Sequence, residues 1–233
     1  MFAPGNQYQD AMSQVAKDYP DAHFIILDGN AEGDNIENLM PNNAQIGQLA
    51  GSLAGLLTKT GSVGFIGGTE LDPTKEKEAN YAAAAKKANP GVDVKSAYAG
   101  SFNDAAKGKE IANSMIKQSN VDVIFGDASV VDTGSREALA AAPGTMDIGQ
   151  PDDLGGADDD LIANSVITDN ESMIEQSMRN VEDGSFGGKT IDGNLSNGGI
   201  KMGTFSDKLV TQEQKDRFAE IVKQVEEGSF LDA

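Results

Sequence analysis

The apolar positions of the chain change repeatedly between two spacings. Tyr8, Met12 and Val15 recur at helical spacing and predict a helix over residues 8–18. Residues 23–27 form a continuous apolar run instead, which is typical of a strand buried on both faces of a parallel sheet. Further strands are predicted at 63–66, 92–98, 121–125, 146–149, 162–167 and 199–204, the last as one arm of a glycine-rich hairpin. Helices are predicted to begin near residues 46, 74, 104, 134, 173 and 211.

Strands that alternate with helices of this length predict an α/β fold with parallel sheets flanked by helices and right-handed crossovers. In such sheets, ligands bind outside the carboxyl ends of the strands. The loops in which a binding site is expected are therefore 28–30, 67–72, 100–104, 126–134 and 150–156.

The composition narrows the function classes. Eighteen Lys and Arg residues against 37 Asp and Glu residues give a net charge of −19, which disfavours binding to nucleic acid or to an anionic membrane surface. There is no cysteine, which excludes disulfides, thiolate catalysis and cysteine-bound metals. No apolar run is long enough to cross a membrane, and the first residues resemble neither a signal peptide nor a lipoprotein signal.

Catalytic and metal-binding motifs are not found. The sequence has no Walker loop, GxSxG elbow, HExxH or dinucleotide GxGxxG, and its single histidine, His23, opens a strand, which favours a structural role. The acid-rich segment 152–160 has two interpretations, a calcium site or a solvated run of charge, and charge runs are usually solvated. We expect no enzyme activity, no metal and no cofactor.

Several loop segments resemble the basic membrane protein family of substrate-binding lipoproteins. The segments that carry the resemblance are Gly5–Tyr8, Ala16–Pro20, Leu27–Gly29, Gly51–Gly68, Tyr98–Lys109, Val121–Phe125, Gly184–Gly188 and Gly198–Ile200, with Phe205. They cover essentially the whole chain in the family's order. The resemblance implies an extracytoplasmic receptor that captures a small solute, with purine nucleosides the best-known ligands, and passes it to an ABC transporter permease.

The family fold implied by the resemblance is the two-lobed, type I periplasmic-binding-protein-like fold, whose lobes close on the ligand. We expect lobe one to comprise residues 1–58 and 163–233, and lobe two residues 59–162. The resemblance also implies that Asp28 binds a ribose hydroxyl and that Phe102 stacks on the base, with Asn6 as a further contact. The alternatives from the residues alone are that Asp28 caps a turn and that Phe102 fills the lobe interface.

The sequence departs from the family pattern at three places. Pro151 occupies the position of the first acid of an Ile-Gly-Val-Asp-x-Asp segment, so Asp152 is the expected substitute contact. Thr168 stands where the family has a lysine. The family's first strand, helix and second strand have no counterpart, so we expect a truncated first lobe with three strands and a lipid anchor absent from this chain.

Two other functions stay open. One is a sensory or regulatory protein that uses the same binding fold without transport. The other is an enzyme such as a nucleoside hydrolase, which would need a metal cage or an activated nucleophile.

Overall fold

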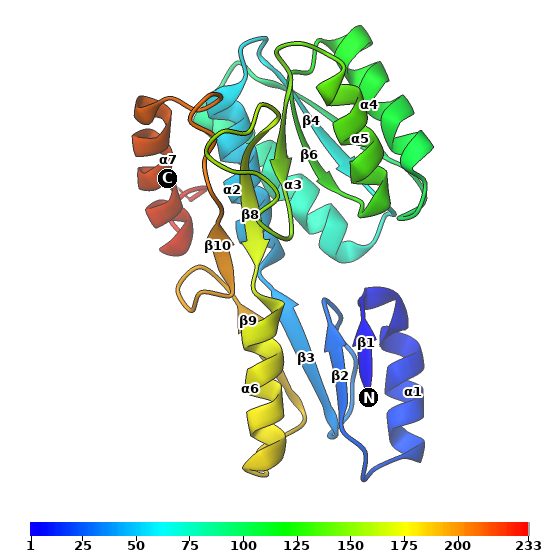
Figure 1. The fold of residues 1–233 in the computed structure, drawn as a ribbon. Coiled ribbons are helices and arrows are strands. Elements are labelled where there is room, and N and C mark those ends of the chain that lie inside the picture. Colours follow the sequence, from blue (N-terminus) through cyan, green and yellow to red (C-terminus); the bar gives the residue numbers. More distant parts are fainter. Residues whose placement is uncertain (233) are drawn as a thin grey trace. The chain divides into compact units, whose positions relative to one another are not determined.

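The computed structural model describes residues 1–232, which form two compact units (Figure 1). Unit 1 comprises Met1–Asn42 and Thr168–Lys201, and unit 2 comprises Asn43–Ile167 and the chain from Met202 onward. The chain therefore passes three times from one unit to the other, after Asn42, Ile167 and Lys201.

Unit 1 is built on a four-stranded sheet with the order β1-β2-β3-β9, in which every neighbouring pair is parallel. The strands are β1 (Phe2–Pro4), β2 (Phe24–Leu27), β3 (Ile36–Pro41) and β9 (Lys189–Gly193). The short 3-10 helix η1 (Asn6–Tyr8) and α1 (Gln9–Asp18) connect β1 to β2, and α6 (Asn170–Glu182) precedes β9. Helix α1 packs on β2, whereas α6 packs on β3 and β9.

Alternation along β2 divides the core of unit 1 between the two faces of its sheet. Phe24 and Ile26 pack with Met12 of α1, whereas Ile25 packs with Met173 of α6. The fully buried carboxylate of β3, Glu37, accepts hydrogen bonds from Ser177 Oγ (2.6 Å), Asn180 Nδ2 (2.9 Å) and the Gly187 N–H (3.2 Å). These bonds satisfy a charge that would otherwise be costly to bury, and they attach α6 to the sheet.

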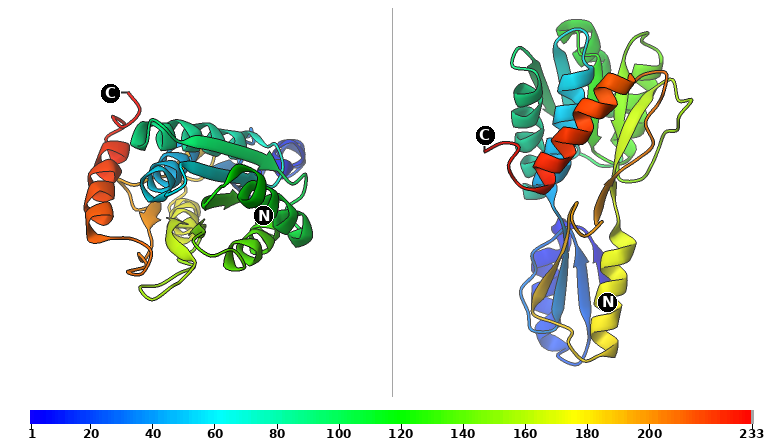
Figure 2. Two further views of the ribbon diagram at one scale, coloured as in Figure 1. Left: turned by 90° about the horizontal axis from the view of Figure 1, so that it is seen from above. Right: turned by 90° about the vertical axis from the view of Figure 1, so that its left-hand side faces the viewer.

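Unit 2 is built on a six-stranded sheet with the order β10-β8-β7-β6-β4-β5, of which Ile200 and Lys201 of β10 and Thr168 of β8 fall within the residue range of unit 1. The strands are β4 (Ser62–Gly67), β5 (Asp93–Tyr98), β6 (Val123–Asp127), β7 (Met146–Gly149), β8 (Ile162–Thr168) and β10 (Ile200–Met202). The helices are α2 (Asn43–Leu57), α3 (Asp72–Ala88), α4 (Ala105–Ser119), α5 (Val130–Ala140) and α7 (Gln212–Glu226). Helix α7 lies beside α2 (Figure 2).

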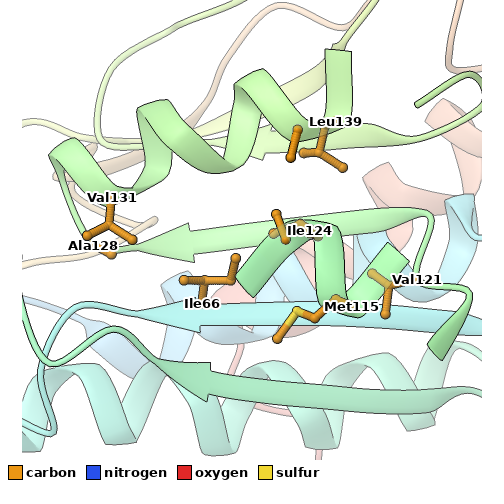
Figure 3. Close-up of a cluster of buried hydrophobic side chains, with 9 residues drawn as sticks. Ile66, Met115, Val121, Ile124, Ala128, Val131 and Leu139 are labelled. Carbon is orange, nitrogen blue, oxygen red and sulfur yellow. The ribbon is translucent and has the colours of Figure 1, made fainter. Parts of the chain in front are cut away.

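The sheet of unit 2 has an apolar layer on each face. Ile66 and Ile124 pack with side chains of α4 and α5, such as Met115 and Leu139 (Figure 3). On the opposite face, Phe65 and Phe125 pack against the fully buried Tyr81 ring of α3, with centroids 5.8 and 5.9 Å away. Burial on both faces explains why these strands read as continuous apolar runs.

The boundaries of the units differ from the expected lobes, since α2 lies in unit 2 rather than in lobe one. A side chain at Gly47, Gly51 or Gly55 would collide with the backbone of Lys77, Tyr81 or Ala85 of α3, so α2 and α3 approach closely along these glycines. Helix α7 then packs on α2 and belongs to unit 2 as well. Strand β8 up to Ile167 is likewise in unit 2, because it pairs with β7.

Most of the predicted helices and strands are confirmed within a few residues, including the capping box of α7 at Thr211 and Gln214. Strands β1 and β3 were not predicted, and for β9 only an arm of the hairpin without stated bounds was predicted. The predicted hairpin near residue 200 is wrong, because β9 pairs in parallel with β3 and β10 lies beside β8. Unit 1 therefore has four strands, with β8 outside its sheet, in place of the expected three.

Among the described residues, none of the helices combines the length and the apolar character needed to span a bilayer.

Candidate functional site

The first candidate surface is the rim of unit 1, defined here as residues 5–8 and 28–30, which follow β1 and β2. Gln9 Oε1 accepts hydrogen bonds from Asn6 Nδ2 (2.9 Å) and from the backbone N–H of Asn30 (3.1 Å). The Asn6 backbone also lies close to Gly29. The structure thus brings together two predicted contacts, Asn6 and Asp28, at the carboxyl edge of one sheet.

Asp28 has an unusual backbone conformation. Its φ of 51° lies in the left-handed region, which is sparsely populated by residues other than glycine, asparagine and aspartate. Its N–H donates to the Leu39 carbonyl (2.8 Å), so the residue extends the pairing of β2 and β3 while its chain turns away. Such conformations concentrate at functional sites, where the surrounding structure maintains them.

The second candidate surface is the rim of unit 2, defined here as residues 68–71, 99–104, 127–130 and 150–156. These loops follow β4, β5, β6 and β7. The half-buried Phe102 ring lies directly against Gly68, where any side chain would collide with it. The Phe102 carbonyl accepts the Val130 N–H (3.0 Å), so the turn that carries the ring is attached to the loop after β6. Ser129 in that loop has a left-handed φ of 57°.

A buried ion pair lies beneath the rim of unit 2. Asp127, the last residue of β6, is 3.0 Å from the Lys77 ammonium of α3, and both side chains are largely buried. Although burial alone would raise the pKa of Asp127, the Lys77 charge and hydrogen bonds from Lys77, Thr74 and Gln150 lower it below its ordinary value. Asp127 is therefore an anion, and its backbone carbonyl accepts the Gly68 N–H (3.0 Å).

Gln150 connects the loop after β7 to this ion pair. Its Nε2 donates to Asp127 Oδ1 (2.9 Å) and to the Gly126 carbonyl oxygen (2.5 Å). The Asp127 carboxylate thereby joins the end of β6 to helix α3 and to the loop after β7.

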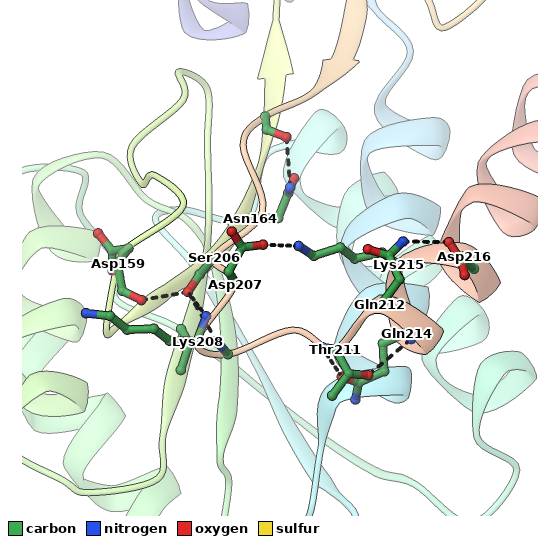
Figure 4. Close-up of polar contacts among 12 residues, drawn as sticks. Asp159, Asn164, Ser206, Asp207, Lys208, Thr211, Gln212, Gln214, Lys215 and Asp216 are labelled. Atoms are coloured by element: carbon green, nitrogen blue, oxygen red, sulfur yellow. Dashed lines mark hydrogen bonds and ion pairs between the residues drawn. The ribbon is translucent and has the colours of Figure 1, made fainter.

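The acid-rich segment after Gln150 is largely used in internal contacts. Asp153 accepts from the backbone N–H and hydroxyl of Thr204, and Asp159 Oδ1 accepts from two backbone N–H groups, those of Leu161 and Ile162. Ser206 Oγ donates to the Asp159 carbonyl (2.6 Å) (Figure 4). Asp152, the predicted ligand contact, is exposed. Across residues 1–232, no three acidic or histidine side chains are grouped as a metal site would require.

Thr168 is the last residue of β8 and the first residue of the second segment of unit 1, Thr168–Lys201. The next residue, Asp169, caps α6 through the Ser172 N–H and forms an ion pair with Lys201 (2.6 Å). His23 lies just before β2, is exposed and stacks on Phe186 with ring centroids 4.6 Å apart.

A second group of buried carboxylates lies between α5 and the sheet of unit 2. Burial raises the pKa of Asp147 to about 8, although Arg136 NH1 lies 3.5 Å from its Oδ2 and opposes the shift. Burial likewise raises the pKa of Asp132 to about 7, although its Oδ2 accepts the Ala128 N–H (2.9 Å). Proton binding at these two residues is therefore linked to the stability of unit 2.

Residues 1–231 match the family model Bmp, described as ABC transporter substrate-binding protein PnrA-like. The chain belongs to this family. It is 31% identical to the ABC transporter nucleoside-binding protein BmpA of Lactococcus lactis, over 99% of this chain and 70% of that protein.

Solved structures show the same α/β fold. A solute-binding protein of an ABC transporter system from Aeropyrum pernix matches with a TM-score of 0.82 at 18% identity, over 95% of this chain and 73% of that one. A transcriptional activator of the comK gene from Bacillus halodurans matches with a TM-score of 0.80 at 23% identity, over 97% and 78% of the two chains. The PnrA-like family membership and the fold that the sequence predicted are both confirmed.

The structure adds two rim residues that were not predicted from the sequence, Asp127 and Gln150, and Lys77 of α3 beneath them. Asp127 could have been identified from the sequence, because it is a polar residue at the end of a buried strand and lies within the loop region 126–134. Lys77 gave no signal, because a lysine on an alanine-rich helix is usually solvated. Gln150 stood in the segment that departs from the family pattern, but nothing in the sequence indicated its partner.

Proposed function

We propose that this PnrA-like protein binds a purine nucleoside as the extracytoplasmic receptor of an ABC importer. The observation that carries the proposal is Phe102, an aromatic ring supported by Gly68 on a rim where ligands of α/β folds bind. A base that stacks on such a ring gains about 1–3 kcal/mol. The nucleoside-binding name of the Lactococcus relative supports the same ligand class.

The other predicted contacts have chemistry that suits a ribose. Asp28 offers carboxylate oxygens and Asn6 an amide on the rim of unit 1, while the exposed Asp152 lies on the rim of unit 2. Carboxylates accept hydrogen bonds from two vicinal hydroxyls. Thr168 supplies a hydroxyl at the end of β8. The proposed partners are therefore a nucleoside or related solute and a transporter permease.

Thermal unfolding with a panel of solutes tests the ligand class. Inosine, guanosine and adenosine at saturating concentration should raise Tm, because a ligand that binds only the folded state stabilises it. Free ribose and a free base should raise it less, since each engages only part of the contacts. An unchanged Tm for every nucleoside would overturn the proposed ligand, and release of free base from inosine would indicate an enzyme.

A regulatory function is the second candidate, supported by the fold match to the comK activator. Deleting the gene separates the two functions. If the protein is a transport receptor, the deletion should abolish uptake of radiolabelled nucleoside. If it is a regulator, the deletion should alter transcript levels and leave uptake unchanged.

A further inference from the structure

The carboxamide of Gln150 has only one acceptable orientation. Both of its polar neighbours, the Gly126 carbonyl oxygen and Asp127 Oδ1, are acceptors, so the nitrogen must face them. The ion pair with Lys77 keeps Asp127 charged, which makes a flipped amide, with its oxygen against a carboxylate, strongly unfavourable. The amide orientation is therefore fixed by the chemistry of its surroundings.

The opposite end of this amide is left to accept a hydrogen bond. No residue in the described range 1–232 donates to Gln150 Oε1, and the atom is not among the buried polar atoms that lack a partner. Oε1 is thus an accessible acceptor whose position is set by two hydrogen bonds on the nitrogen side. The Gln150 side chain therefore loses its conformational entropy when the protein folds, so that this entropy is not lost again when a ligand binds.

The acceptor belongs to the same rim as the stacking ring. The Asp127 residue that holds Gln150 also binds the Gly68 N–H through its carbonyl, and the Phe102 ring lies against Gly68. Both groups are therefore positioned by one short chain of contacts within unit 2.

We propose that Gln150 is a specificity-determining residue, which reads a hydroxyl or an N–H of the ligand through Oε1. This inference rests on the proposed function. A site built to accept a hydrogen bond discriminates against an analogue that lacks the donor, because the acceptor is then desolvated without a partner. Gln150 thereby supplies a neutral acceptor immediately before Pro151.

Isothermal titration with matched analogues tests the proposal. The unsubstituted chain and Gln150→Leu are titrated with inosine, its 2′-, 3′- and 5′-deoxy analogues and 1-methylinosine, which separate a ribose hydroxyl from a base N–H as the donor. We expect one analogue to bind the unsubstituted chain about tenfold more weakly than inosine. Gln150→Leu should bind inosine about tenfold more weakly and should no longer distinguish that analogue.

Gln48→Leu is the matched control, because Gln48 is also a half-buried glutamine of unit 2 with one side-chain hydrogen bond, to Asn80 (3.1 Å). It should retain the discrimination of the unsubstituted chain. Should Gln150→Leu fail to fold, Gln150→Asn, which is one methylene too short to place its oxygen equally, should show the same loss.

The outcomes are distinguishable. A uniform loss of affinity with the analogue ratios unchanged would mean that Gln150 only holds the loop, and it would overturn the proposal, as would unaltered binding. If the unsubstituted chain binds no nucleoside, the proposed function fails and this inference fails with it.

Discussion

The two rims lie at the carboxyl ends of parallel strands in the two sheets, yet different forces hold them in place. On the rim of unit 1, Gln9 connects Asn6 and Asn30 through two hydrogen bonds between neutral groups. On the rim of unit 2, a buried anion, Asp127, receives hydrogen bonds from Lys77 and Gln150.

The energies of these two arrangements differ. A neutral hydrogen bond contributes about 0.5–1.5 kcal/mol net, so the rim of unit 1 can rearrange at little cost. Leaving a buried charge without its partner costs about 3–5 kcal/mol, so the rim of unit 2 is held in one arrangement. We infer that unit 2 offers a preformed surface with Phe102, whereas the contacts of unit 1 can adjust.

The largest effect is expected from Lys77→Met, which leaves Asp127 buried without its cation. The free energy of unfolding should fall by about 3–5 kcal/mol, measured by urea unfolding. Lys86→Met is the control, since Lys86 is exposed on the same helix and should change little. The double variant Lys77→Met/Asp127→Asn should recover part of the loss. A loss in Lys77→Met no larger than in the control would show that the ion pair does not hold this rim.

The second effect concerns pH and is confined to unit 2. Because the folded-state pKa values of Asp132 and Asp147, about 7 and about 8, exceed those of an unfolded chain, the folded state binds more protons. Stability should therefore fall as pH rises from about 4 to about 8, by roughly a few kcal/mol, and then level off. Urea unfolding at several pH values measures the slope.

Asp147→Asn removes one of these groups and should flatten the pH profile, with higher stability than the unsubstituted chain above pH 8. The control is Asp158→Asn, at an exposed position in the acid-rich segment. Identical pH profiles for Asp147→Asn and the unsubstituted chain would contradict the claim that the folded state binds extra protons at Asp132 and Asp147.

The smallest effect is expected from Gln9→Leu on the rim of unit 1. Loss of the acceptor for Asn6 and Asn30 should cost roughly 1 kcal/mol. Faster amide hydrogen exchange at Asn30, with core strands unaffected, would be the local signature. Gln14→Leu, at an exposed position of α1, is the control. A loss as large as that of Lys77→Met would remove the contrast between the rims.

Regular apolar spacing made most of the fold predictable. Strands such as β4 and β6 are buried on both faces and therefore appear as apolar runs. Strand β3 escaped prediction because Glu37 and Asn38 interrupt its apolar residues, and only tertiary hydrogen bonds from α6 make Glu37 tolerable there. The placement of α2 with α3 was equally hidden, since glycines at four-residue spacing indicate a close helix contact without indicating the partner.

Only those residues of the candidate site that lie in a loop after a predicted strand could be identified from the sequence. Asp28 and Phe102 were identified in this way, with the family resemblance, and their ligand roles remain predictions. Lys77, Asp127 and Gln150 come from three separated segments, so their network depends on sheet order, which one sequence does not specify.

The central claim is that Phe102 on the preformed rim of unit 2 stacks on a nucleoside base. Isothermal titration of inosine into the unsubstituted chain, Phe102→Tyr and Phe102→Ala tests it most directly. We expect Phe102→Tyr to bind with similar affinity and Phe102→Ala to bind about 5- to 150-fold more weakly, which corresponds to a loss of about 1–3 kcal/mol of stacking. Unfolding curves should confirm that each variant is folded. Equal affinity for Phe102→Ala and the unsubstituted chain, or no binding to either, would contradict the claim.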